Sequence, residues 1–62
     1  MKTLMYEDVN LETGFSYSIY RFSGLSGKSY LIYECNQDGH MKYIREFTSY
    51  DNAVAFVKCK CK

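Results

Sequence analysis

Three stretches of the chain are rich in large apolar side chains, and their spacing is typical of β-strands. They cover residues 15–22, 29–35 and 40–47, and stretches rich in Gly, Ser, Asn and Asp separate them. The Asp38–Gly39 pair predicts a tight hairpin between the last two. Residues 3–9 are a candidate for one more strand. The pattern therefore predicts an antiparallel meander of three strands, or of four if residues 3–9 join it.

The hydrophobic period changes to that of a helix after the last strand. Thr48 or Ser49 can cap such a helix, and an acidic Asp51 in its first turn suits the helix dipole. At 100° per residue one side of the helix is apolar and the other is polar. The apolar side holds Tyr50, Ala53, Val54, Phe56, Val57 and Cys61. The expected fold is a single α+β domain over residues 1–62, with one C-terminal amphipathic helix packed on one face of the sheet.

The expected hairpins also predict which side chains share a face. A loop over residues 24–27 places Ile19 opposite Ile32 and Tyr17 opposite Glu34. A two-residue turn at Asp38–Gly39 places Cys35, Tyr33 and Ile32 opposite Lys42, Ile44 and Arg45. The face richer in apolar residues then holds Phe15, Tyr17, Ile19, Tyr30, Ile32, Tyr43 and Phe47. We expect the helix to cover this face.

The opposite face of the sheet is also too apolar to be an ordinary solvated surface. Because one helix covers only one face, this second face needs another cover: residues 1–11, a second copy of the chain, or a partner. The residues that we expect to cluster near its middle are candidates for a protein interface. They are Tyr20, Phe22, Leu31, Tyr33 and Ile44, with Lys42 beside them.

Composition and charge indicate the class of protein and its cellular compartment. Aromatic residues make up 18% of the chain, which argues against disorder. The formal net charge is only +1, which gives no overall electrostatic attraction to nucleic acid or to an anionic membrane. No apolar run approaches the roughly 18 residues of a membrane span. Three cysteines are an odd number, which fits free thiols in a reducing compartment. A cytoplasmic location is expected.

Three stretches suggest chemistry, and each has a simpler interpretation. Cys59-Lys60-Cys61 resembles a metal-ligand pair, but a continuing helix points the two thiols about 200° apart. A thiol enzyme needs a base and an orienting group beside the nucleophilic cysteine. His40 is the only histidine that could be the base, and it follows a turn, where solvent-exposed residues are usual. Ser23–Lys28 precedes a strand, whereas a phosphate-binding loop precedes a helix. We expect no catalytic site, no metal and no cofactor.

The best functional hypothesis is a binding module that contacts protein, either a second copy or a target. The alternative is a weak nucleic-acid binder in which bases stack on the aromatic face and Arg21, Lys28 and Lys42 contact phosphates. The small net charge makes this alternative the weaker one.

One part of the chain supports both classes of partner. The run of strand, Phe47, Thr48–Ser49 cap and Ala53-x-x-Phe56 helix is similar to the small N-terminal domain of phage-type integrases. It is equally similar to some small phage inhibitors of bacterial defence systems. The resemblance covers about half of the chain, and together with the small size it implies an accessory or inhibitor protein of a phage or mobile element.

Overall fold

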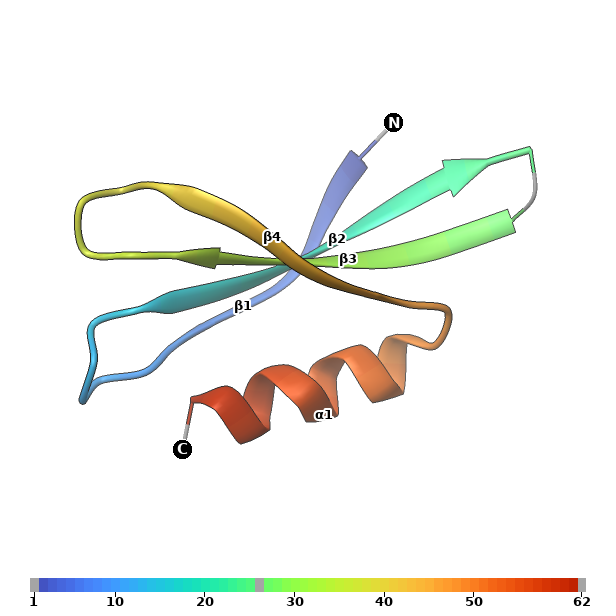
Figure 1. Cartoon of the computed structure of the whole chain (residues 1–62). Coiled ribbons are helices and arrows are strands. Elements are labelled where there is room, and N and C mark those ends of the chain that lie inside the picture. The colour runs from blue at the N-terminus through green and yellow to red at the C-terminus, as the bar shows by residue number, and fades with distance from the viewer. Residues whose placement is uncertain (1, 26, 62) are drawn as a thin grey trace.

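Four strands and one helix make up the computed structural model, which describes residues 2–25 and 27–61. The elements are β1 (Lys2–Val9), β2 (Ser16–Gly24), β3 (Gly27–Cys35), β4 (Met41–Phe47) and α1 (Tyr50–Lys60). The strands form one antiparallel sheet in the order β1-β2-β3-β4, and α1 lies across one face of it (Figure 1). The α+β prediction is confirmed, and the candidate segment at residues 3–9 is a strand.

The central hairpin has the predicted register. Ile19 pairs with Ile32 and Tyr17 pairs with Glu34. The strands are longer than expected, because the ladder continues to Gly24 opposite Gly27. Most of the predicted Ser23–Lys28 loop is therefore strand. Gly27 has a φ of +120°, which few other residues adopt and which permits so short a connection.

The second hairpin differs from the prediction in two places. Its connection is a turn in which Gly39 N–H bonds to the Asn36 carbonyl, and Gly39 has a φ of +88°. The Asn36 side chain accepts bonds from the backbone N–H groups of Asp38 and His40, at 2.9 and 3.0 Å. This geometry is a type I turn followed by a left-handed glycine, which adds one residue to the loop. The predicted two-residue turn is therefore wrong.

A bulge in β4 compensates for the longer turn. Tyr33 pairs with Tyr43, whereas Ile32 pairs with Arg45, so Ile44 is the extra residue between two pairs. The predicted pairing of Ile32 with Arg45 is correct for this reason. Nearer the turn, the predicted register is wrong by one residue, and the side chains there change faces.

Because of this register difference, three residues lie on the opposite face of the sheet from the one predicted. Ile44 was expected on the second face, but it packs against the core under α1. Lys42 was also expected there, but it pairs with Glu34 on the helix side of the sheet. Tyr43 was expected under the helix, but it is 51% exposed and contacts Tyr33 on the other face.

The core lies between α1 and the sheet. Ile19, Ile32, Ala53 and Val57 have no exposed surface, and Tyr17 is buried beside them. Helix α1 begins after Ser49, whose side-chain oxygen accepts the backbone N–H of Asn52. The predicted apolar side of α1 faces the sheet, with Val54, Phe56 and Cys61 at its margin.

Asn10 fixes the end of α1 to the sheet. This buried side chain donates from Nδ2 to the Lys60 carbonyl at 2.8 Å and accepts the Glu12 N–H at 2.9 Å. It thereby satisfies a carbonyl in the last turn of the helix and holds the β1–β2 turn closed. Figure 1 shows the C-terminal end of α1 beside this turn.

Candidate protein-binding site

The face of the sheet opposite α1 is the candidate site, and we call it the open face. Strand alternation and the observed register place side chains from all four strands on it. They are Lys2, Leu4, Glu7 and Val9 from β1, Ser16, Ser18, Tyr20 and Phe22 from β2, Ser29, Leu31, Tyr33 and Cys35 from β3, and Met41, Tyr43 and Glu46 from β4.

The N-terminal segment does not cover the open face. Residues 2–9 lie in the plane of the sheet as the edge strand β1, paired with β2. Only Tyr6 of this strand joins the helix-side core, while Leu4 and Val9 extend the open face. Over residues 2–25 and 27–61 no helix or strand lies across this face (Figure 1).

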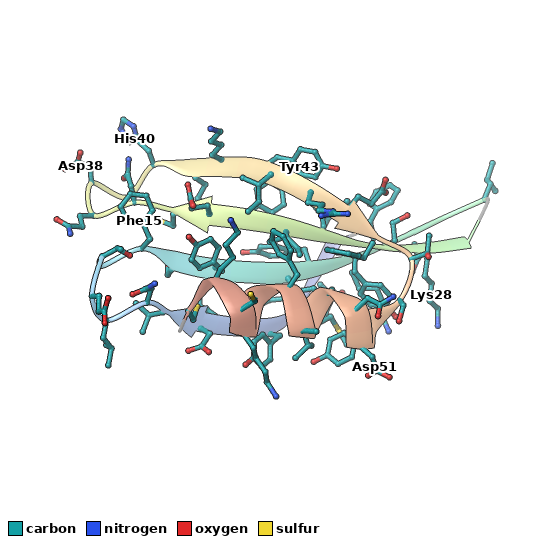
Figure 2. All side chains as sticks on the ribbon, turned by 60° about the horizontal axis from the view of Figure 1, so that its bottom comes forward. Phe15, Lys28, Asp38, His40, Tyr43 and Asp51 are labelled. Atoms are coloured by element: carbon teal, nitrogen blue, oxygen red, sulfur yellow. The ribbon has the colours of Figure 1, made fainter. Side chains whose placement is uncertain are left out.

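A row of three tyrosines crosses the middle of the open face. The rings of Tyr20 and Tyr33 meet edge to face with centroids 5.6 Å apart, and those of Tyr33 and Tyr43 do so at 5.8 Å. Such edge-to-face pairs hold their rings in fixed orientations. The Lys2 ammonium lies 5.4 Å from the Tyr33 centroid and adds a cation–π contact. In Figure 2, Tyr43 lies at the β4 edge, away from α1.

Apolar side chains around this row are exposed to an unusual degree. Leu4 is 49%, Phe22 44% and Met41 54% exposed, in addition to Tyr43. Exposed Leu or Met side chains are ordinary singly, but here they share one sheet face with the tyrosine row. Aromatic residues and Met are also the types enriched at protein interfaces.

Four of the five predicted interface residues are on this face. Tyr20, Phe22, Leu31 and Tyr33 are there, whereas Ile44 is on the helix side. The prediction missed Tyr43, because its position depends on the turn length and the bulge. The Asn36 side-chain bonds that select the longer turn come from a residue type favoured in turns, so Asn36 was the available signal.

The basic residues of the nucleic-acid alternative do not accompany the aromatic row. Arg21 pairs with Tyr30 and Lys42 with Glu34, and both of these partners face α1. Lys28 lies two residues before Tyr30 on the same side of β3 (Figure 2). Lys2, Glu7 and Glu46 are the charged residues on the open face, so acids outnumber bases there.

A shallow depression lies at one end of the open face. Glu7, Val9 and Ser16 line it, together with Asp8 of the same edge strand. The Ser18 hydroxyl donates to Glu7 Oε2 at 3.3 Å, which keeps the Glu7 carboxylate over the sheet. The depression is therefore acidic at one side and apolar at the other.

The titratable groups under α1 have structural roles. Burial, followed by a hydrogen bond from its hydroxyl to Glu34 Oε2 at 2.9 Å, raises the pKa of Tyr17 to about 12. Burial also raises the pKa of the Cys61 thiol, with a smaller effect of Asp8. A raised pKa disfavours the reactive thiolate.

The other sulfur and imidazole groups are scattered. Cys35, Cys59 and Cys61 are free thiols, and Cys59 is exposed on α1. His40 is exposed beside Asp38 at the β3–β4 turn (Figure 2). Within residues 2–25 and 27–61, no three His, Cys, Asp or Glu side chains gather as metal ligands would.

In the part of the chain that the structure describes, no helix has both the length and the apolar character needed to cross a bilayer. No protein-family model, curated protein or solved structure matches the chain significantly.

Proposed function

We propose that this protein is a non-catalytic binding module whose open face is a protein interface. The observation that carries the proposal is the contiguous set of exposed aromatic and aliphatic side chains on a face that α1 leaves uncovered. Tyr20, Tyr33 and Tyr43 are held by mutual ring contacts, so little side-chain entropy remains to be lost on binding. The small size and the strand-to-helix run fit an accessory protein of a phage or mobile element, acting inside a cell.

Protein is a better partner for this face than nucleic acid. A nucleic-acid surface of this type needs basic groups around the stacking rings. Here Arg21, Lys28 and Lys42 are on the helix side of the sheet, and Glu7 and Glu46 flank the tyrosine row. Acids beside the rings would repel phosphates.

Photo-cross-linking in the source cells tests the proposal. A photoreactive phenylalanine analogue replaces Tyr43 on the open face and, as the matched control, Ala55, which is exposed on α1. We expect ultraviolet light to join the Tyr43 variant to protein, either a second copy or another chain, and to leave the Ala55 variant unjoined. Cross-links to nucleic acid, equal cross-linking at both positions, or none at Tyr43 would contradict the proposal.

A further inference from the structure

The tyrosine row of the open face already holds one cation, and this cation belongs to the chain itself. The Lys2 ammonium lies 5.4 Å from the centroid of the Tyr33 ring. A cation over the face of a tyrosine is attracted by the negative charge of the π-system. The open face therefore contains a position that accepts an ammonium group.

The neighbouring rings add to this position. Tyr20 of β2 and Tyr43 of β4 stand on either side of Tyr33, and their ring planes lie at 88° and 64° to the plane of the Tyr33 ring. Tyrosine rings set at steep angles to one another are the arrangement with which proteins surround alkylammonium groups. Tyr43 is 51% exposed, so a group from outside can reach this part of the row.

Two carboxylates lie on opposite sides of the tyrosine row. One cross-strand row of the sheet runs from Tyr43 to Glu7 at the β1 edge, and the next row carries Tyr20 and ends in Glu46 at the β4 edge. Ring faces and carboxylates both attract cations and repel anions. The charge of this surface therefore favours a cationic ligand.

Lys2 holds the position only weakly. It is exposed on an edge strand, and over residues 2–25 and 27–61 it is the only base on the open face. A long lysine side chain loses rotamer freedom when it is held in one place, and an exposed cation–π contact is a weak one. A second cation that brings further apolar contacts can therefore displace Lys2.

We propose that the open face binds a lysine side chain of its protein partner, and that the ammonium group of this side chain replaces Lys2 over the Tyr33 ring. The aliphatic stem of a lysine packs on apolar surface while its charged end stays near water. Leu4 beside Tyr20, and Met41 at the start of β4, offer such surface to the residues around the lysine. This inference rests on the proposed function and names the group by which the partner is recognised.

Two matched peptides test the inference by nuclear magnetic resonance titration. They are acetyl-Leu-Lys-Leu-amide and the same peptide with norleucine in place of lysine, which keeps the aliphatic stem and lacks the charge. With the Lys2→Met variant, whose ring is free, we expect the lysine peptide to bind about two- to fivefold more tightly than the norleucine peptide. The ring signals of Tyr33 should shift with the lysine peptide. With the wild-type protein the preference should be smaller, because Lys2 competes.

Variants of the protein identify the residues involved. Lys2→Met should bind the lysine peptide more tightly than the wild type does. Lys58→Met is the matched control, because it makes the same change on the exposed side of α1, and it should leave the affinity unchanged. Tyr33→Leu keeps an apolar side chain but removes the ring, so this variant should bind both peptides equally. Circular dichroism verifies that each variant is folded.

Four results would overturn the inference. They are equal binding of the two peptides to Lys2→Met, no binding of either at millimolar concentration, equal gains in Lys58→Met and Lys2→Met, and a lysine preference that persists in folded Tyr33→Leu. Butylammonium is the same cation without a peptide. If it bound as tightly as the lysine peptide, the face would be a site for small amines, which would also overturn the inference.

The outcome for the inference is separable from the outcome for the proposed function. If the peptides bind equally while the photoreactive variant at Tyr43 joins protein, the inference fails and the proposed function stands. If the lysine preference is found but the Tyr43 variant joins no protein, the proposed function fails, and the assignment of a protein side chain fails with it.

Discussion

The two faces of this sheet are made by the same strands and have different environments. Ile19 and Ile32 are fully buried under α1, while their neighbours Tyr20 and Leu31 on the open face keep part of their surface in water. Alternation supplies each strand with two apolar sides, but α1 has one apolar stripe. The comparison shows that this chain closes one hydrophobic layer and leaves the apolar side chains of the second face partly exposed.

The polar contacts of the two faces differ in the same way. On the helix side, Tyr17 donates to Glu34 and Asn10 donates to the carbonyl of Lys60, so that buried groups are satisfied within the chain. On the open face, ring–ring contacts dominate, and Glu7 keeps a carboxylate near the surface. The first pattern is that of a core, and the second is that of a surface whose polar groups remain open to solvent.

The largest difference between the faces should appear with a pair of consecutive residues in β3. Ile32→Ala removes a fully buried side chain under α1 and should lower the free energy of unfolding by about 3 kcal/mol. Leu31→Ala on the open face should lower it by roughly 1 kcal/mol or less. Urea unfolding at a concentration where the protein is monomeric measures both. Equal losses would contradict the difference between the faces.

A second consecutive pair tests the bulge in β4. Ile44→Lys places an ammonium group against the helix-side core and should destabilise the monomer by about 2 kcal/mol. Tyr43→Lys should change the monomer's stability by no more than about 0.5 kcal/mol. Thermal melts measure the stability of both variants. If Tyr43→Lys destabilised the monomer more than Ile44→Lys, the register without a bulge would be the correct one.

The attachment of α1 to the sheet should respond to Asn10. Asn10→Ala leaves the Lys60 carbonyl and the turn N–H groups without their partner and should cost about 1–2 kcal/mol. Asn52→Ala on the exposed side of α1 is the control and should have little effect. Hydrogen exchange should show faster opening of the last turn of α1 in the Asn10 variant alone.

The smallest expected effect is a pH dependence on the helix side. Because Tyr17 has a folded-state pKa of about 12 against an ordinary value near 10, its contribution to stability is complete below pH 10. It is lost as the pH rises through about 12. Tyr17→Phe should therefore flatten the alkaline fall in the free energy of unfolding. Tyr43→Phe on the open face should leave that fall unchanged.

Local sequence signals were sufficient for the elements and for the central hairpin under α1. The period-two runs, the Ser49 cap and the apolar stripe of α1 predict the strands, the helix and the pairing of Ile19 with Ile32. Each of these depends on residues close in sequence. The predicted apolar side of α1 also stays the same if either end of the helix is placed one residue too early or too late.

The details of β4 could not be obtained in this way. A one-residue difference in turn length reverses every side chain that follows, and a bulge reverses them again. Both occur here, so the pairing of Ile32 with Arg45 is correct while Tyr43 and Ile44 exchange faces. The Asp38–Gly39 pair is compatible with both turns, and the choice depends on the Asn36 side-chain bonds.

Cross-linking from both faces of the molecule tests the open face as an interface most directly. A photoreactive phenylalanine analogue replaces Phe22, which is 44% exposed on the open face, or Ala55, which is exposed on α1. We predict that light joins the Phe22 variant to protein, either a second copy or another chain, and leaves the Ala55 variant unjoined. Cross-links from Ala55 alone, or from neither position, would contradict the account.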